Sequence, residues 1–429
     1  MKNNVKNLIE FIDHSPSCFH VIENARKQFL EHGFTELEEK EYWDLEEGKS
    51  YFVTRNGSSM IAFHLPKKDF QGFHIVASHS DSPTYRIKEQ PEMSVEKHYT
   101  KLNIERYGGM IPETWFDRPL SVAGRIIIEE NGQIKDQLVN VDRDLMIIPN
   151  LAIHMSRSSN ESKQLNPQKD LLPLCGGNLT KDAFEEMIAK ESGVEKEDIL
   201  SYDLFLYNRM RGTTLGINEE FVAAPKLDDL ECAYSSIEGM LNAKLSKDYV
   251  TVCAVFDNEE VGSGTKQGAG STFFPEVLKR ISYLCGKNEE EYYMAVADSF
   301  MLSADNAHAV HPNYQDKTDP TNRPYINEGI VLKYNASQKY TTDANSAALV
   351  KYLCKKEKIK CQVFFNRSDM LGGSTLGNIL TGQVSIKAAD IGLPQLSMHS
   401  TYETAGCKDL DDMITLMGSF YELGKEVQI

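Results

Sequence analysis

The sequence predicts an α/β protein in which a mixed, mostly parallel sheet is flanked by helices and interrupted by a β-rich insert. Its 429 residues are too many for one ordinary core, which favours two domains. After residue 226, short apolar runs alternate with helical patterns, as in sheets covered on both faces. Between residues 90 and 225, strand-like patterns dominate instead. We therefore expect one domain from residues 1–89 plus 226–429 and a second from residues 90–225.

The first segment predicts a helix and then a buried strand. In "SPSCFHVIENARKQFLEHG", Ser15 is suited to cap a helix, Pro16 to its first turn and Gly33 to its end. Apolar residues recur between them at helical spacing. The run "GFHIVASHSDS" is short, apolar and bounded by polar residues, which is consistent with a buried strand ending near Ala77.

The middle segment predicts antiparallel strands. "GRIIIEENGQIKDQLVNV" contains two strand-like runs on either side of Asn131-Gly132, a dipeptide typical of tight hairpin turns. "SSNESKQLNPQKD" is polar throughout and predicts a loop. We expect residues 90–225 to form a β-rich insert.

The segment after residue 226 predicts strands and helices in alternation. The expected helices are "LDDLECAYSSIEGMLNAK", "PEVLKRISYLC", "ANSAALVKYLCKKEK" and "LDDMITLMGSFYELGKEV". The expected strands are "YVTVCAVF", "YYMAVADS", "CQVFF" and "VSIKAADIG". Sheets of this kind bind ligands beyond the carboxyl ends of their strands.

Composition excludes several functional classes. A net charge of −17 argues against binding to nucleic acid or an anionic membrane, because both require a basic surface. The start of the chain has no secretory signal pattern, and no apolar run is long enough to span a bilayer. The eight cysteines form no C-x-x-C pair and several lie in apolar runs. We expect a cytoplasmic protein with reduced cysteines.

Acids and imidazoles follow the predicted strands or begin the predicted helices. They are His79 and Asp81, Asp228 and Asp229, Glu259 and Glu260, Asp305 with His308 and His311, and His399. Since each set lies at the end of a strand or the start of a helix, all of them can converge on one rim of the sheet.

This set of side chains suits divalent metal ions. Imidazole nitrogens and carboxylate oxygens are ligands of Zn²⁺ and similar cations. Several carboxylates for few imidazoles indicate two ions, because one carboxylate can bridge a pair. Two ions about 3.5–4 Å apart can hold a hydroxide at neutral pH and polarise a carbonyl. The sequence therefore predicts a hydrolase.

The neighbouring acids Glu259 and Glu260 fit this chemistry. Two adjacent carboxylates at the end of a buried strand raise each other's pKa unless a cation lies nearby. One can bind metal while the other acts as the base on the metal-bound water. Similarly, residues two apart on an extended backbone point the same way, so Asp81 can accept a hydrogen bond from the far ring nitrogen of His79.

Each of these residues alone has an ordinary structural interpretation. A single histidine or acid near a strand end is more often a cap or a surface group, and Asp228-Asp229 alone suits a helix N-terminus. His308 and His311 are the weaker candidates. The glycines of "GSGTKQGAGS" lack the Lys-Ser/Thr ending of a phosphate loop. The prediction depends on five segments that carry ligand-type residues together.

At these segments the sequence resembles the aspartyl aminopeptidase family, metallopeptidase family 18, which includes vacuolar aminopeptidase I. The matching motifs are "FIDHSPSCFHVI", "SHSDSP", "YGGMIPETWFDRPLSVAGR", "IPNLAIH", "KLDDL", "FDNEEVGS", "SADNAHAVHPNY", "GIVLKYN", "GGSTLG" and "LSMHS". They occur in family order and cover most of the chain.

The resemblance implies a fold and an assembly. The expected catalytic domain is of the zinc-exopeptidase type and is interrupted by a β-rich dimerisation domain. Dimers are expected to assemble into a tetrahedral homododecamer that encloses its active sites. The implied activity is that of an aminopeptidase, which removes N-terminal residues from peptides.

The resemblance also implies a ligand set for two divalent ions, Zn²⁺ above all, with Mn²⁺ or Co²⁺ as alternatives. His79, Asp228 and Asp305 would hold one ion. Asp228, Glu260 and His399 would hold the other, so that Asp228 bridges the pair.

Four further residues receive roles from the resemblance. Glu259 would be the general base, and Asp81 the outer partner of His79. His154 would reach the active site of a neighbouring subunit and help to hold the reacting carbonyl. Lys333 would belong to the pocket for the substrate's N-terminal side chain.

The chain departs from the family pattern at four positions. Asn258, Gly372, Tyr402 and Lys226 stand where His, Cys, Arg and Arg are common. None is a proposed ligand or the base, but Asn258 and Tyr402 are expected near the pocket and leave the side-chain preference open. Some members of the family prefer acidic N-terminal residues, and others prefer neutral or hydrophobic ones.

Two rival functions remain open on the sequence. One is another hydrolase on the same zinc scaffold, a carboxypeptidase or a deacylase. The other is a catalytically silent assembly or cargo protein that keeps the fold. The intact set of ligands and base speaks against the silent protein.

Overall fold

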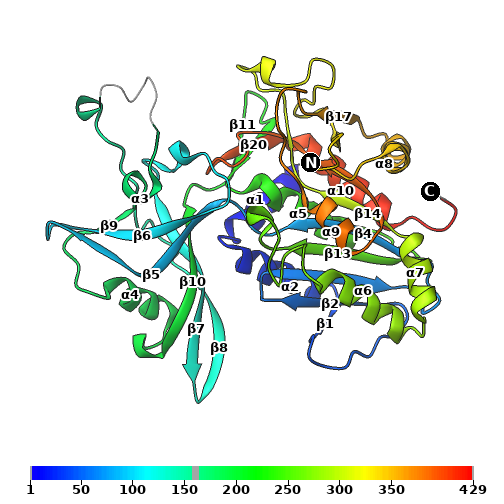
Figure 1. Cartoon of the computed structure of the whole chain (residues 1–429), viewed down its shortest axis with the longest axis horizontal. Helices are drawn as coiled ribbons and strands as arrows, with labels where there is room; N and C mark the ends of the chain where they lie inside the picture. The colour runs from blue at the N-terminus through cyan, green and yellow to red at the C-terminus, as the bar shows by residue number, and fades with distance from the viewer. Residues whose placement is uncertain (1, 157–163, 428–429) are drawn as a thin grey trace.

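The computed structural model describes residues 2–156 and 164–427. Two bodies lie side by side, one built on a nine-stranded sheet and the other on a six-stranded sheet (Figure 1). A five-stranded sheet completes the architecture. The protein is thus of the α/β class, as the sequence predicts.

The nine-stranded sheet is mostly parallel at its centre. Its order is β1 (Thr35–Leu37), β2 (Lys49–Arg55), β3 (Ser59–Leu65), β13 (Val250–Phe256), β4 (Phe73–His79), β14 (Phe300–Ala304), β18 (Lys387–Gly392), β16 (Ile330–Tyr334) and β17 (Cys361–Phe365). β13, β4, β14 and β18 are parallel neighbours. Every residue of β4 and β13 is buried, in agreement with their largely apolar sequences.

Helices cover both faces of this sheet. One face packs against α1 (Lys2–Asp13), α2 (Cys18–Glu31), α5 (Leu227–Asn242), α8 (Ala344–Glu357) and α10 (Cys407–Tyr421). The other packs against α6 (Phe273–Leu284), α7 (Glu289–Ala297) and α9 (Leu376–Gln383). Within the described ranges, no helix combines the length and the apolar character that a membrane crossing requires.

The small sheet lies beside α5 and α10. Its order is β11 (Thr213–Leu215), β12 (Phe221–Ala224), β20 (Glu403–Gly406), β19 (Pro394–Leu396) and β15 (Ala307–His308). The loop between β19 and β20 carries His399, so this sheet positions one predicted ligand.

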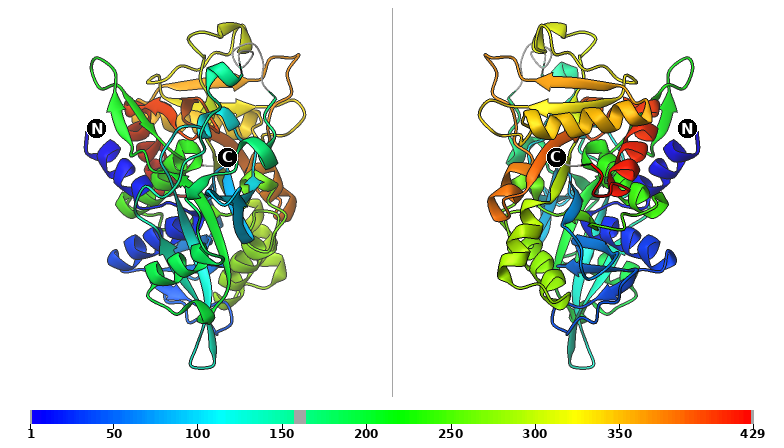
Figure 2. Two further views of the ribbon diagram at one scale, coloured as in Figure 1. Left: turned by 90° about the vertical axis from the view of Figure 1, so that its left-hand side faces the viewer. Right: turned by 90° about the vertical axis from the view of Figure 1, so that its right-hand side faces the viewer.

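The β-rich body contains β8 (Gln133–Asn140), β7 (Leu120–Glu130), β10 (Ile199–Asn208), β5 (Thr84–Val95), β6 (Tyr99–Tyr107) and β9 (Leu174–Gly176), in that order. α3 (Pro167–Asp170) and α4 (Ala183–Ser192) accompany it. The predicted hairpin joins β7 to β8 through Asn131 and Gly132, with φ of 54° and 75°, and Figure 2 shows it projecting from the molecule. β5 begins at Thr84, ahead of residue 90, and the predicted domain limits remain predictions.

Two expected elements were wrong. "YYMAVADS" is not a strand: most of it belongs to α7, and the strand is β14, which follows it. Asn288 and Glu291 form a reciprocal capping box that starts α7.

The N-cap of α2 is Ser17 instead of the predicted Ser15, and the Ser15 hydroxyl accepts a hydrogen bond from Asn24. Of the expected polar loop, residues 158–163 lie outside the described residues and the last four form α3.

Candidate metal centre

Three parallel strands deliver ligand-type side chains to one edge of the large sheet. His79 is the last residue of β4 and pairs with Phe256 at the end of β13. Glu259 and Glu260 follow in the short 3₁₀ helix η5 (Glu259–Val261). Asp305 comes directly after β14, which runs parallel to β4. Aligned carboxyl ends therefore bring these residues together, as expected.

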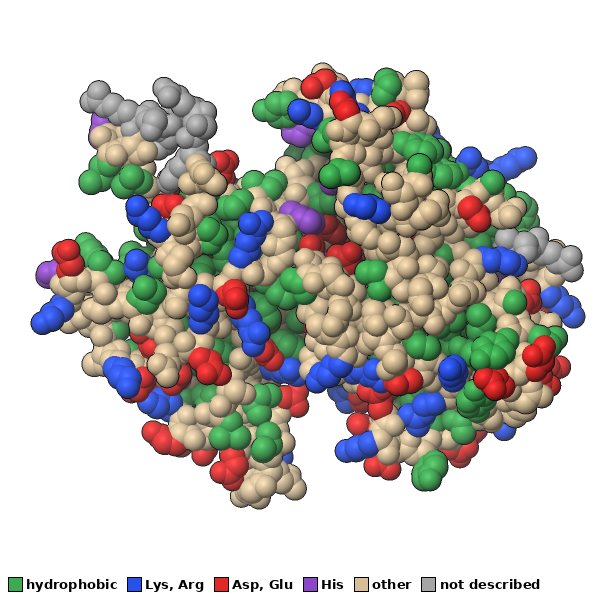
Figure 3. All heavy atoms as spheres, viewed as in Figure 1, with side chains coloured by type: hydrophobic (Ala, Val, Ile, Leu, Met, Phe, Trp, Pro, Cys, Tyr) green, Lys and Arg blue, Asp and Glu red, His purple; other side chains and the backbone are tan. Residues whose placement is uncertain are grey.

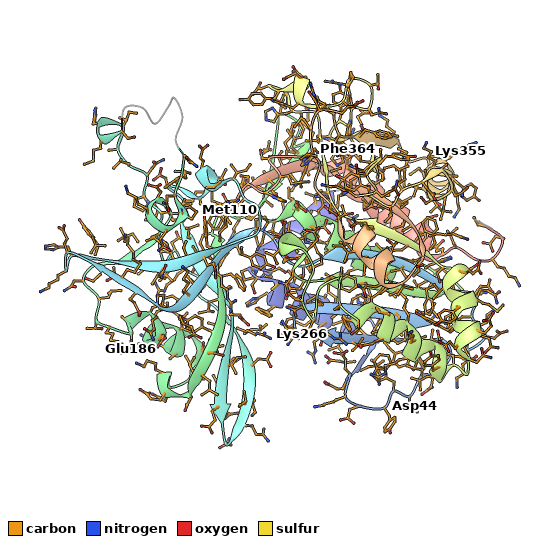
Figure 4. The ribbon with its side chains drawn as sticks, viewed as in Figure 1. Asp44, Met110, Glu186, Lys266, Lys355 and Phe364 are labelled. Atoms are coloured by element: carbon orange, nitrogen blue, oxygen red, sulfur yellow. The ribbon has the colours of Figure 1, made fainter. Side chains whose placement is uncertain are left out.

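Two further segments complete the cluster. Asp228 and Asp229 lie in the first turn of α5 and are joined by a cis peptide bond. His399 has a φ of 65°, and its carbonyl accepts a hydrogen bond from the Ile111 amide at 3.0 Å. The neighbouring Met110, labelled in Figure 4, lies where the two bodies meet. The ligand loop is thus also held by the segment that follows β6.

The side chains form three overlapping groups of possible metal ligands. The groups are His79, Asp228, Asp229 and Asp305; His79, Glu259 and Glu260; and Asp228, Glu260 and His399. Within each group, one ligand atom per residue lies within 4.8 Å of all the others. Both three-residue sets implied by the family resemblance are contained in these groups.

Asp228 lies at the centre of the cluster. Its Oδ1 is 3.6 Å from His79 Nε2, and its Oδ2 is 3.3 Å from His399 Nε2. His399 Nε2 is also 3.5 Å from Glu260 Oε2. One carboxylate oxygen therefore faces each imidazole, which is the arrangement that a bridging ligand requires.

The residues present fit divalent cations. Asp228 Oδ1, Asp229 Oδ1 and Glu260 Oε1 are buried and have no hydrogen-bond donor among the described residues. A buried carboxylate oxygen without a partner is costly unless a cation neutralises it. Nitrogen and oxygen donors without thiolate suit Zn²⁺ and similar ions. The cluster therefore has both the ligands for a cation and the need for one.

The pKa values show the same shortage of positive charge. Burial raises the pKa of Glu259 to about 8 and that of Glu260 well above its ordinary value. Burial also raises the pKa of Asp305. Burial acts in the same direction on Asp228, but the imidazoles of His399 and His79 beside its carboxylate lower its pKa. Figure 3 shows a histidine and several acids together in a hollow near the middle of this face.

Asp81 holds the glutamate pair more directly than it holds His79. Its Oδ1 accepts from the Glu259 amide and its Oδ2 from the Glu260 amide, each at 3.1 Å. His79 Nδ1 is 3.0 Å from the main-chain oxygen of Asp81 and 3.4 Å from its Oδ1. The expected carboxylate contact is therefore the longer of the two, because the carboxylate oxygens already accept main-chain amides.

Of the two residues predicted to bind substrate, Lys333 lies beside the cluster and His154 lies outside it. Lys333 is buried, and its Nζ donates to the carbonyls of Asp305 and Asn306 at 2.6 and 3.2 Å. The same atom is 3.7 Å from Asp305 Oδ1. His154 is exposed in η2 (Ile153–Met155) and belongs to none of the three ligand groups.

The two weaker histidine candidates lie outside the ligand groups found among the described residues. The His308 ring is 6.0 Å from that of Phe364, measured between centroids. His311 Nδ1 accepts a hydrogen bond from the Asn313 amide. Neither residue contributes to the cluster.

Glu403 is a site residue that the sequence did not indicate. It is buried, and it accepts hydrogen bonds from the amides of Asp228 and His399 at 2.9 and 2.7 Å. It thereby ties together the main chains of two candidate ligands. Asp229 plays a similar part, since its Oδ2 accepts from the His79 amide at 3.1 Å. The sequence offered only the proximity of Glu403 to "LSMHS" as a signal.

Comparisons with known proteins identify a family. The sequence model of the family described as aminopeptidase I zinc metalloprotease (M18) matches residues 11–421. A probable M18 family aminopeptidase 2 of Clostridium novyi (strain NT) is 45% identical over 437 residues, covering 99% of this chain and all of the relative.

Solved structures give the same result. The structure of the Ape4 and Nbr1 complex matches with a TM-score of 0.95 and 37% identity, over 98% of this chain and 85% of that one. The mApe1 dodecamer of S. cerevisiae matches with a TM-score of 0.85 and 26% identity, over 98% and 97% of the two chains. Both likenesses extend over nearly the whole chain.

Proposed function

This chain belongs to the M18 family of aminopeptidase I zinc metalloproteases, and from that premise we propose that it cleaves N-terminal residues from peptides at a centre for two divalent ions. The observation that carries the proposal is the set of three overlapping ligand groups. The family membership makes the chain a metalloaminopeptidase, and the paired centre is our own inference.

The proposed ligands divide into two sets that share Asp228. His79, Asp228 and Asp305 would hold one ion, and Asp228, Glu260 and His399 the other. Support comes from the two oxygens of Asp228, each of which faces a different imidazole. When bound, such ions supply Lewis acidity for a carbonyl and for water. Zn²⁺ is the expected ion, with Mn²⁺ and Co²⁺ as alternatives.

Glu259 is the proposed general base. Glu260 belongs to two of the ligand groups, whereas Glu259 belongs to one only. Its carboxylate can therefore stay free of metal, accept a proton from the attacking water and give that proton to the leaving amine. The main-chain amide of Glu259 is fixed by Asp81, which limits the directions in which this carboxylate can point.

Four residues are proposed to recognise the substrate. Asp305 and Glu259 are candidates for the free α-amino group, because both are acids within the cluster. Lys333 would contribute positive charge beside Asp305, which favours Asp and Glu as N-terminal residues, with neutral or hydrophobic residues as alternatives. His154 would act on the active site of a neighbouring subunit, and its exposure in the β-rich body leaves it free to do so.

The proposed oligomeric state is based on that of a structural relative. The S. cerevisiae mApe1 protein is a dodecamer, and we place this chain in a homododecamer of dimers with tetrahedral symmetry. The β-rich body would serve as the dimerisation domain. The free state of all eight cysteines supports a cytoplasmic location.

A panel of fluorogenic aminoacyl substrates tests the proposed function. Asp and Glu should be compared with Leu and Ala, and each with its N-acetylated form. Cleavage of free-amine substrates alone is the expected result. Cleavage of the acetylated forms would favour a deacylase, and cleavage at the free carboxyl end of peptides a carboxypeptidase. No metal-dependent turnover would favour a silent assembly or cargo protein.

A further inference from the structure

The β-rich body reaches the glutamate pair through Tyr107, the last residue of β6. The Tyr107 hydroxyl donates to Asp81 Oδ2 at 2.7 Å. Asp81 in turn accepts from the amides of Glu259 and Glu260. Asp81 therefore links the insert to the turn that carries the proposed base and a proposed ligand.

Asn258 fixes the direction of the Tyr107 hydroxyl. The Asn258 Oδ1 accepts from Thr265 Oγ1 and from Gln267 Nε2, both at 2.7 Å. This assigns the amide, so that Asn258 Nδ2 donates to the Tyr107 oxygen at 2.8 Å. Because the Tyr107 oxygen accepts from Asn258, its proton is directed to Asp81. The network has one consistent orientation.

The main chain after β6 also packs closely on the glutamate turn. A Cβ added at Gly108, where φ is 78°, would lie 3.1 Å from Glu260 Cβ and 3.4 Å from its carbonyl oxygen. This position therefore suits glycine on both conformational and steric grounds. The end of β6 thus contacts the turn through a side chain and through its backbone.

We propose that Tyr107 is a positioning residue through which the β-rich body fixes the turn bearing Glu259 and Glu260. The inference rests on the proposed function, because it assigns those glutamates to the metal centre. Asn258, which the sequence placed near the substrate pocket, belongs to this network. Removing the hydrogen bonds that orient a metal ligand typically lowers the metal affinity or the activity of the site about 10- to 100-fold.

Simple packing is the alternative role for Tyr107. Its ring lies edge-on to Phe205 at 5.7 Å between centroids and borders a cavity of about 290 Å³ between the two bodies. Replacement by phenylalanine keeps the ring and these contacts and removes only the hydroxyl. Tyr85 in β5 of the same sheet offers a matched control, because it is fully buried and its hydroxyl has no hydrogen-bond partner in the described structure.

The test compares Tyr107→Phe with Tyr85→Phe. Zinc affinity is measured on the metal-stripped full chain by competition with a chelator, and kcat and KM on the reloaded enzyme. We expect Tyr107→Phe to weaken zinc binding about 10-fold or more and to lower kcat by a similar factor, while KM changes by less than about twofold. Zinc affinity and kcat equal to those of Tyr85→Phe would overturn the proposal.

A double-mutant cycle adds a second readout. Asn258→Gly removes the side chain and tolerates the left-handed φ of 63° at this position. If both residues act through Asp81, their effects on zinc affinity should be clearly less than additive. Fully additive effects would contradict the network. Because zinc affinity needs no peptide, these outcomes stay distinct from a failure of the proposed peptidase activity.

Discussion

Glu259 and Glu260 are adjacent in sequence but are held for different tasks. Both amides are bound by Asp81, yet only Glu260 approaches His399, at 3.5 Å. We expect Glu259→Gln to retain its metal while kcat falls about a hundredfold or more, because the amide cannot carry the proton. Elemental analysis and steady-state kinetics check this, with Glu290→Gln, an exposed position, as the control. Normal turnover in Glu259→Gln would remove Glu259 as the base.

Glu403 stabilises the main chain beneath two ligands. In Glu403→Gln, one oxygen becomes an NH₂ group that cannot accept the amide of Asp228 or of His399. We expect zinc affinity to fall about 10-fold in a chelator competition, since ligand orientation is lost. Glu422→Gln changes an exposed acid that also accepts a main-chain amide, that of Lys244, and serves as the control. Equal affinities for the two variants would show that Glu403 has no such role.

The sequence indicated the candidate metal ligands more clearly than the residues that fix the main chain of those ligands. His79, Glu260 and His399 have recognisable motifs, because ligand chemistry restricts the type of residue. Glu403 and Asp229 act on main-chain amides, and the position of an amide in space cannot be read from local sequence. The contact between His79 and Asp81 was predicted through the carboxylate, whereas the nearer acceptor is the main-chain oxygen.

At the scale of elements, β4 contains a histidine whose burial disfavours its charged form. His74 is buried, and its Nδ1 has no hydrogen-bond partner in the part of the chain that the structure describes. Its ring stacks on that of Tyr249 at 4.0 Å between centroids. Burial lowers its pKa to about 3, against 6.5 for the ordinary value. Between pH 3 and pH 6.5, His74 binds a proton more readily in the unfolded chain than in the folded protein. The free energy of unfolding therefore falls as the pH drops from 6.5 towards 3.

His74→Phe should therefore flatten the loss of stability at acid pH. The contribution of His74 has a limiting slope of about 1.4 kcal/mol per pH unit within this window and is absent above pH 6.5. Thermal midpoints of metal-stripped protein from pH 7 to pH 4.5 measure it, with the exposed His14→Phe as the control. Parallel pH profiles for wild type and His74→Phe would contradict this account.

Element prediction succeeded where local and tertiary preferences agree. The Asn131-Gly132 hairpin and the buried strand β13 have signals that no tertiary contact opposes. The strand predicted at residues 292–299 was wrong. Its apolar residues suit a strand, but the capping box at Asn288, four residues earlier in the chain, starts a helix. The order of the strands depends on long-range pairing and was not predicted.

At the scale of the whole molecule, the two bodies meet at the candidate metal centre through Tyr107 and the β6–Ile111 segment. The proposed role of His154 extends this sharing to a neighbouring subunit. We expect His154→Ala and Glu259→Gln each to be nearly inactive alone. When the two variants are reassembled together at random, half of the dimers contain one chain of each variant, and each of these dimers holds one complete site. The mixture should therefore recover roughly a quarter of the wild-type rate.

Dissociation and reassembly of the two variants together tests this prediction. Wild-type protein taken through the same treatment gives the reference rate. If both variants are inactive alone, no recovery on mixing, with mixed assemblies confirmed by native mass spectrometry, would mean that His154 acts within its own subunit. An active His154→Ala variant would mean that His154 has no such role.

The most direct test of the account is the number of zinc ions bound by each chain. Metal-stripped wild type and His399→Ala are reloaded with zinc, dialysed and measured by elemental analysis against protein concentration. We expect about two ions per wild-type chain and about one in His399→Ala, because Asp228 and Glu260 alone hold the second ion poorly. One ion or none in the wild type, or two in the variant, would contradict a paired centre.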